Sequence, residues 1–225
     1  GLFHLLTHAF FKALLFLCSG SVIHGTHTQE MPQMGGMWRK MPITAITMLI
    51  GVLAICGIPL FSGYYSKDAI IAQSLFFWQG EMESDGGVVT PGHPQHILLF
   101  LLPVGGAAIT AFYMFRLYFL TFTGKPRDHH IYEHTHESSA VMWFPLAVLA
   151  FYSVVVGYGF NDESPLLTRV LTFSKPHTML PHPSEHIHEQ AGLLALVAVI
   201  FGIGMSILFY YVRVLNPAEL PRQFP

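Results

Sequence analysis

Residues 4–17 read HLLTHAFFKALLFL, a strongly apolar run that carries three titratable side chains. These are His4, His8 and Lys12, and their spacing of four places them along one face of a helix. At about 1.5 Å per residue the three span roughly 12 Å, a good part of a bilayer core of about 30 Å. A lysine ammonium at such a depth costs about 2.5–3.5 kcal/mol on insertion scales. A residue that costly points to a function.

The composition is typical of a helical membrane protein. Of the 225 residues, 52% are hydrophobic and 11% are charged, whereas a soluble domain averages about 25% charged residues. Apolar runs of about 20 residues recur, which is the length a helix needs to cross a bilayer. The formal net charge of −2 does not favour a nucleic-acid partner. Cys18 and Cys56 lie singly in apolar runs, so neither a disulfide framework nor a zinc knuckle is indicated.

These features predict an all-α fold, a polytopic bundle of transmembrane helices in a single domain over residues 1–225. The first residue is a glycine and the chain opens inside an apolar segment, so we expect a fragment of a longer polypeptide. About five membrane segments are predicted, at about residues 1–24, 42–79, 95–123, 139–160 and 189–214.

The second predicted segment, 42–79, is too long for one crossing and contains a break. Gly57 and Pro59 mark it, because glycine loosens a helical turn and proline lacks a backbone donor. Gly63 follows shortly after. A helix broken inside the membrane frees backbone groups that only protein or a water-filled cavity can satisfy. Transporters use such breaks to form ion sites.

Lys67 and Asp68 follow this break directly. As neighbours on a helix they point about 100° apart, so each is expected to face a different partner. Gly63 lies on the same helical face as Lys67 and is expected to leave room beside it. A structural alternative is that Lys67 snorkels to an interface. His4 or His8 alone could likewise be a hydrogen-bonded packing group.

Two further groups of polar residues favour structural interpretations. Arg116, near one end of the third segment, is expected to snorkel or to pair with a neighbour. The loop histidines have the spacing of metal ligands, but no cysteine accompanies them, so a solvated loop is expected and no metal site is assigned. These histidines are His129, His130, His134, His136, His177, His182, His186 and His188.

The distribution of lysine and arginine predicts the orientation in the membrane. The loops after the first and third segments and the C-terminal tail are rich in these residues, and the loop at 81–93 has none. The positive-inside rule therefore places the two loops and the tail on the cytoplasmic or matrix side. The residues counted are Arg39, Lys40, Lys125, Arg127, Arg213 and Arg222 on that side, against Arg169 and Lys175 on the other.

A series of short motifs occurs in order along the chain. They are the run 4–17, Gly20-Ser-Val-Ile-His24, Met34-Gly35-Gly36-Met37, Pro42 with Thr44, Gly57-Ile-Pro59-Leu-Phe61-Ser-Gly63, Ser66-Lys67-Asp68 with Ile70, Arg116 after Tyr113, and His134-Thr-His136-Glu137-Ser138. Together they resemble the antiporter-like membrane subunits of respiratory complex I, the proton-translocating NADH:quinone oxidoreductase. The nearest branch is the large distal subunit, called subunit L or subunit 5. The resemblance covers nearly the whole chain and is densest over residues 1–72.

The resemblance implies a role in proton translocation. The chain would be the C-terminal part of a longer subunit, and its segments would be helices eleven to fifteen of that subunit. The second segment would be a discontinuous helix. Lys12 with His4 and His8 would relay protons along a central polar axis, and Lys67 with Asp68 would be a gate toward the outer face. The cofactors NADH, FMN, iron–sulfur clusters and quinone would sit on other subunits, with none on this chain. The adjacent antiporter-like subunit would be a partner, and the bacterial inner membrane the location.

The chain departs from the family pattern in places, and other functions stay open. Glu30 stands after Gln29 where aspartate is common, and Tyr64 follows Gly63 where phenylalanine is usual. Neither change touches the predicted relay. The alternatives are the large subunit of a multisubunit sodium/proton antiporter or a hydrogenase-linked membrane arm, and a non-conducting structural or histidine-loop metal-binding module.

Overall fold

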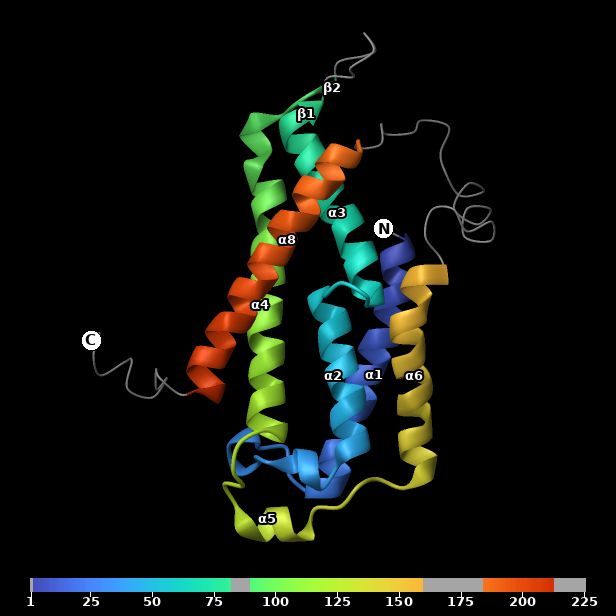
Figure 1. Cartoon of the computed structure of the whole chain (residues 1–225), viewed down its shortest axis with the longest axis vertical. Coiled ribbons are helices and arrows are strands. Elements are labelled where there is room, and N and C mark those ends of the chain that lie inside the picture. The colour runs from blue at the N-terminus through green and yellow to red at the C-terminus, as the bar shows by residue number, and fades with distance from the viewer. Residues whose placement is uncertain (1, 82–89, 160–183, 213–225) are drawn as a thin grey trace, which may run out of the picture.

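The computed structural model describes residues 2–81, 90–159 and 184–212 as a bundle of long helices (Figure 1). In Figure 1, α2 and α3 run one after the other in the same direction along the longest axis, and the other long helices alternate in direction with this pair. They are α1 (Leu2–Thr26), α2 (Pro42–Cys56), α3 (Ser62–Gln79), α4 (Ile97–Phe122), α6 (Ala140–Gly159) and α8 (Glu185–Ser206).

Short elements connect these helices. The strands β1 (Gly80–Glu81) and β2 (Thr90–Pro91) pair antiparallel, with Gly80 opposite Pro91. The remaining elements are η1 (Met31–Gln33), η2 (Met37–Arg39), η3 (Pro94–His96), α5 (His129–His134) and a π-helical turn, η4 (Ile207–Tyr211), that extends α8.

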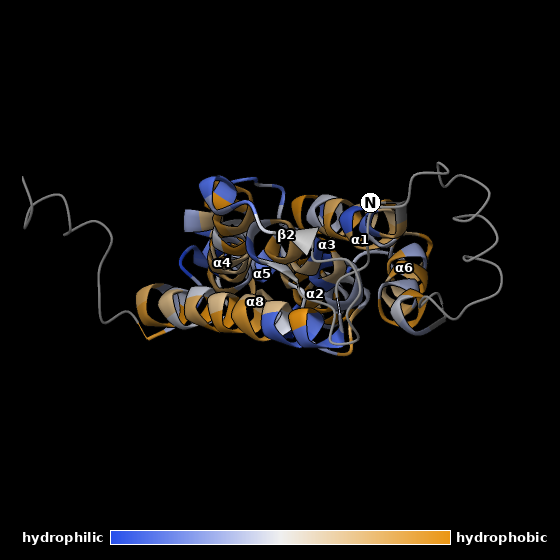
Figure 2. Ribbon diagram, turned by 90° about the horizontal axis from the view of Figure 1, so that it is seen from above, coloured by the Kyte–Doolittle hydropathy of each residue, from blue (hydrophilic) through white to orange (hydrophobic). Residues whose placement is uncertain are grey.

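The described helices have the length and composition of membrane spans. Four are long and apolar enough to cross a bilayer, and α2 is a shorter apolar helix. Hydrophobic residues, coloured orange, predominate along their ribbons (Figure 2), and exposed side chains such as Leu5, Leu102 and Val141 lie on the outside of the bundle. The predicted fold class, an all-α polytopic bundle, is therefore confirmed. The four spans are Phe3–Thr26, Pro94–Phe122, Ala140–Tyr158 and Glu185–Tyr211.

The predicted break in the second segment is also confirmed, between α2 and α3. Gly57 adopts a left-handed conformation with φ of 77°, and its N–H donates to the Ala54 carbonyl at 3.1 Å. The Ile58 N–H donates to the Leu53 carbonyl at 3.1 Å, which completes a Schellman-type helix end. Leu60 also has a positive φ, 79°, which is a strained value for a residue with a side chain.

Gly63 also allows the two halves of the broken segment to meet closely. A Cβ at this position would collide with the backbone carbonyl oxygen of Ala54 near the end of α2. Gly63 therefore allows α3 to start directly against α2. At Gly57 a Cβ would lie 3.4 Å from the Lys67 Cδ, so Gly57 is a direct neighbour of the lysine side chain.

Two apolar clusters fill the interior. The larger one joins α1, α2, α4, α6 and α8, and the smaller one joins α3, α4 and α8, so α8 contributes to both. Fully buried members include Leu14, Val52, Leu146 and Val199 in the larger cluster and Ile71, Leu75 and Ala191 in the smaller one.

The loop after α5 fastens the end of the bundle where α1 ends and α2 begins (Figure 1). The Glu137 carboxylate accepts hydrogen bonds from the Ile43 N–H at 2.8 Å, the Thr44 N–H at 3.3 Å and the Thr44 hydroxyl at 2.6 Å. Ser21 Oγ lies 2.9 Å from Thr44 Oγ1 and 2.6 Å from Ser138 Oγ. We call Ser21, Thr44, Glu137 and Ser138 the Glu137 cluster. It satisfies the free N–H groups at the start of α2.

Candidate functional site

The first histidine of the opening run, His4, lies against α3. The ring centroids of His4 and His8 are 5.9 Å apart, as expected for one helical face. His4 Nδ1 lies 3.0 Å from Ser66 Oγ, and the Thr7 hydroxyl donates to the same oxygen at 2.9 Å. Ser66 precedes Lys67 in the chain. The structure therefore brings the first polar residues of α1 next to the polar residues after the break.

Lys12 lies further along α1, and the structure does not join it to Ser66. Its ammonium is 5.1 Å from the centroid of the Phe16 ring, a cation–π distance. Phe16 is 67% exposed, so this pair lies toward the outside of the described bundle. The helical face that carries His4, His8 and Lys12 thus has two environments, an inner one at His4 and an outer one at Lys12.

Lys67 is held by the end of α2. Its ammonium donates to the carbonyl of Ile55 at 3.0 Å and to that of Cys56 at 3.4 Å. These carbonyls have no helical partner because the helix stops at Cys56, and the C-terminus of a helix carries partial negative charge. The broken helix therefore stabilises a cation inside the bundle. The Lys67 head group binds the protein backbone, which differs from the snorkelling alternative.

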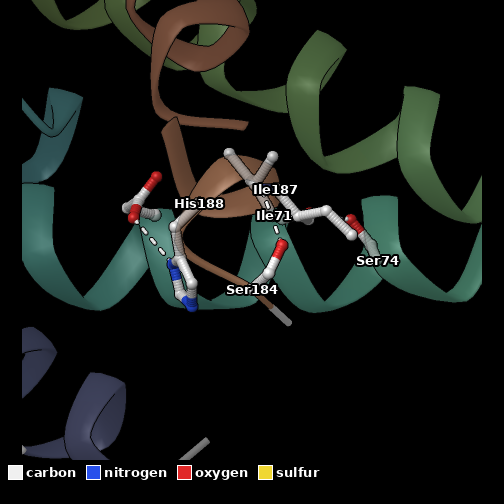
Figure 3. Close-up of polar contacts among 6 residues, drawn as sticks. Ile71, Ser74, Ser184, Ile187 and His188 are labelled. Atoms are coloured by element: carbon white, nitrogen blue, oxygen red, sulfur yellow. Dashed lines mark hydrogen bonds and ion pairs between the residues drawn. The ribbon is translucent and has the colours of Figure 1, made fainter. Parts of the chain in front are cut away.

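Asp68 faces α8, so Lys67 and Asp68 have different partners, as the sequence predicts. Asp68 Oδ2 lies 3.4 Å from Nδ1 of His188, as drawn in Figure 3. The His188 side chain is 41% exposed and that of Asp68 is 20% exposed. The pair thus runs from the interior toward the surface at the first turn of α8.

His188 is a site residue that the sequence interpretation placed in a loop. The helix α8 begins at Glu185, and the Ser184 hydroxyl accepts a hydrogen bond from the Ile187 N–H at 3.5 Å (Figure 3). The signal was present, since a serine followed by a glutamate and then an apolar run is typical of a helix start. Because the helix starts before His188, this residue lies on α8, which packs against α3.

Lys67 and Asp68 both line a small cavity. Its volume is about 10 Å³, close to the roughly 10–15 Å³ that one water molecule needs. Asp68 Oδ1 is buried and has no hydrogen-bond partner among the described residues. A Cβ on Gly192 would lie 3.0 Å from this oxygen. The lining residues are Cys56, Gly57, Tyr64, Lys67, Asp68, Gly192, Ala195, Leu196 and Val199.

The other sequence predictions fall outside this site. Arg116 pairs with an aromatic ring, with its Cζ 5.4 Å from the centroid of Tyr210. Within residues 2–81, 90–159 and 184–212, no group of three or more His, Cys, Asp or Glu side chains is placed to share a metal ion. Several residues lie outside the described part of the chain, namely His177, His182, Arg169, Lys175, Arg213 and Arg222.

The fold and the site define the class, a helical integral membrane protein with a lysine at a broken helix. A family described as "NADH:quinone oxidoreductase/Mrp antiporter, TM" matches residues 1–80. The chain is 40% identical to NADH-ubiquinone oxidoreductase chain 5 of Dictyostelium citrinum over 94% of its own length. Identity is 47% to NADH-quinone oxidoreductase subunit L of Rhodobacter capsulatus and 44% to F(420)H(2) dehydrogenase subunit L of Methanosarcina mazei, each over 70% of this chain.

Residues 1–80 thus match this family, and the chain is similar over most of its own length to proteins named as subunit L or chain 5 of quinone oxidoreductases. It spans less than a third of each relative's length: 30% for the Dictyostelium protein and 22% for the other two.

Proposed function

We propose that the chain forms part of the proton path of a membrane-bound NADH:quinone oxidoreductase. In this proposal it is one transmembrane domain, residues 1–225, within a longer antiporter-like subunit that acts as a translocase. The names of its relatives support this assignment, as does the match of residues 1–80 to a family named for both oxidoreductases and antiporters.

The observation that carries the proposal is the ammonium of Lys67, which lies inside the bundle on the carbonyls of Ile55 and Cys56. An intramembrane lysine that a broken helix holds in place is typical of ion and proton pathways. Protons would travel along α1 through Lys12, His8 and His4 and would leave through Lys67 and Asp68. The 3.0 Å contact between His4 Nδ1 and Ser66 Oγ supports a link between the α1 residues and the Lys67–Asp68 pair.

The chemistry of the path divides between imidazole, hydroxyl and amine groups. Histidine gains and loses protons near neutral pH, and the Thr7 and Ser66 hydroxyls can both donate and accept. The ammonium of Lys12 lies on the Phe16 side of α1, so in this proposal its proton partner is supplied by a surface that packs on that face.

The proposal includes the partners and the location. Other membrane subunits of the complex, in particular an adjacent antiporter-like subunit, would pack on the exposed apolar faces. NADH, FMN, the iron–sulfur clusters and quinone would belong to other subunits. The bacterial inner membrane is the proposed location.

The end of the bundle that holds α5 would face the cytoplasm. Its basic residues support this orientation, because Arg127 donates to the Met31 and Met34 carbonyls at 2.8 and 2.9 Å and so joins two basic loops at one end. Lys40 reaches the Glu133 carbonyl at 3.4 Å at the same end. His188 would then lie toward the outer face.

The test uses the full-length subunit in its assembled complex, in closed membrane vesicles. Lys12→Ala and Lys67→Ala should each strongly lower proton pumping driven by NADH oxidation while the complex remains assembled. Arg116→Ala serves as a control, because Arg116 lies outside the proposed path. Normal pumping in both lysine variants would overturn the proposal.

A second candidate is the large subunit of a multisubunit sodium/proton antiporter, because the matching family description names both kinds of protein. Transport driven by a sodium gradient without NADH would favour it. Transport that requires NADH oxidation and proceeds without sodium would favour the oxidoreductase.

A further inference from the structure

We propose that His188 takes the proton from Asp68 and releases it to water at the outer face. His188 is then the last protein group on the proton path. This inference rests on the proposed function and extends it, since the sequence prediction ended the path at Lys67 and Asp68. The geometry points to a continuous route from Lys67 through one water molecule to Asp68, and from Asp68 to His188.

The first step crosses the cavity between Lys67 and Asp68. Both side chains line it, and it has room for about one water molecule. Asp68 Oδ1 is buried without a hydrogen-bond partner in the described residues, although buried oxygens are nearly always bonded. A water molecule in the cavity would supply that bond and would connect the carboxylate with the ammonium.

The space for this water depends on Gly192. A Cβ at this position would approach Asp68 Oδ1 to 3.0 Å, a distance tighter than ordinary contact. The α8 backbone can therefore pack beside the carboxylate and still leave its inner oxygen accessible from the cavity. Tyr64 closes another side of the same cavity.

The second step runs from Asp68 to His188. Asp68 Oδ2 and His188 Nδ1 are 3.4 Å apart, at the long end of a hydrogen bond. When the Lys67 ammonium gives a proton through the water to Oδ1, the Asp68 carboxylate becomes a carboxylic acid. Rotation of the carboxyl group about its Cβ–Cγ bond then brings this O–H opposite His188. The O–H bond breaks as an N–H bond forms at Nδ1, which converts a neutral Nε2–H imidazole into an imidazolium and restores the carboxylate.

Release follows from the exposure of His188. The side chain is 41% exposed, so the imidazolium ring can turn outward and give its Nδ1 proton to outer-side water. This loss leaves the neutral Nε2–H form, and turning back places Nδ1 opposite Asp68 again. A histidine suits this position because its ordinary pKa lies near neutral pH, so it can both accept and release the proton.

The test compares two histidines on the same turn of α8. His188→Gln removes the proton carrier, and His186→Gln is the matched control because His186 bonds Gln190 on the exposed side at 3.0 Å. Both are made in the full-length subunit of the assembled complex. The initial rate of membrane-potential formation per NADH oxidised is measured in closed vesicles. We expect His188→Gln to lose most of this rate, because a positioned proton carrier is removed, and His186→Gln to leave it unchanged.

Chemical rescue separates proton transfer from structure. Added imidazole can carry a proton in place of the lost side chain, so it should restore much of the rate of His188→Gln. Pyrazole has a similar size but is a far weaker base, and should not restore it. A defect that imidazole leaves unchanged would show that His188 only positions Asp68, and would overturn the inference.

A second pair of variants covers the case in which His188→Gln does not assemble. Gly192→Ala narrows the space at Asp68 Oδ1, whereas Gly204→Ala on the same helix has open space around it. We expect a severalfold lower rate for Gly192→Ala alone. A normal rate in both would overturn the proposed route.

These results also separate the inference from the proposed function. If Lys67→Ala abolishes pumping while assembled His188→Gln pumps normally, the outlet through His188 is wrong and the proton path stands. If Lys67→Ala and Lys12→Ala both pump normally, the proposed function itself fails.

Discussion

The Glu137 cluster and the Lys67 site both place polar groups inside an apolar bundle, but they satisfy them differently. In the cluster, the carboxylate of Glu137 binds two backbone N–H groups and the Thr44 hydroxyl, and Ser21 joins Thr44 to Ser138. The Lys67 site is the start of α3, from Ser62 to Asp68, together with the break before it. Here Asp68 Oδ1 and Ser62 Oγ have no partner among the described residues. The backbone there also has a strained Leu60 with φ of 79°.

This difference distinguishes buried polar groups that stabilise the fold from buried polar groups that serve transport. A network with every partner in place gains rigidity and has nothing left to offer a ligand. A site with unpaired atoms, strained backbone and room for water costs stability, and such costs gather where a protein must bind or move something. The comparison therefore predicts that changes at the Lys67 site alter transport and that changes in the Glu137 cluster alter stability.

The largest effect is expected for Lys67→Arg. Arginine keeps the positive charge at the end of α2 but does not lose its proton in proteins. We expect an assembled complex with proton pumping near background, measured as membrane-potential formation per NADH oxidised. Pumping at the normal rate would show that Lys67 serves only to cap α2, and would remove the contrast between the two regions.

The next effect concerns the junction of the broken helix. Gly63→Ala places a Cβ against the Ala54 carbonyl oxygen, which cannot move away without shifting α2. We expect loss of most assembled complex, measured by native electrophoresis of solubilised membranes. Gly20→Ala is the control, because nothing lies within 4 Å of a Cβ there. Equal assembly of both variants would mean that the junction is more tolerant than its packing indicates.

A moderate effect is expected for Glu137→Ala. The change leaves the Ile43 and Thr44 N–H groups without their acceptor, a loss of about 1–3 kcal/mol. The midpoint of thermal denaturation of the detergent-solubilised complex should fall, while pumping per NADH oxidised stays normal. Glu133→Ala is a suitable control on the neighbouring helix α5, since Lys40 donates to its backbone carbonyl and not to its side chain. A pumping defect in Glu137→Ala at unchanged thermal stability would assign the cluster a transport role.

The smallest effect is expected for Ser21→Ala. It removes the hydroxyl that links Thr44 with Ser138, and a single hydrogen bond contributes about 0.5–1.5 kcal/mol. The same thermal measurement should show a smaller decrease than in Glu137→Ala. The double variant with Ser21→Ala and Glu137→Ala tests whether the cluster acts as a unit, because residues in one network give stability effects that do not add. Strict additivity would speak against one connected cluster.

Local chemistry explains why so much of the fold could be predicted. Long apolar runs predict membrane helices because backbone groups in lipid must bond within their own segment. Gly57 and Pro59 predict the break because one favours the left-handed end of a helix and the other has no N–H to continue it. Each of these arguments needs only residues close together in the chain.

The candidate site was predictable only in part, because partners come from distant segments. Lys67 and Asp68 stood out by their charge in an apolar chain, but their directions depend on what packs around α3. The close approach of α3 to the Ala54 carbonyl at Gly63 was not predicted, because it follows from the path of the chain through Leu60. His188 was missed because its contact with Asp68 spans 120 residues of sequence.

The sequence by itself determined the class of fold, the site of the helix break and the costly residues His4, His8, Lys12 and Lys67. Hydrophobic length, helical spacing and the chemistry of glycine and proline carry that information. Only the tertiary structure decided that Lys67 rests on the end of α2, that Ser66 meets His4, and that Asp68 pairs with His188. Those contacts arise from the packing of α3 between α1 and α8, which no local pattern encodes.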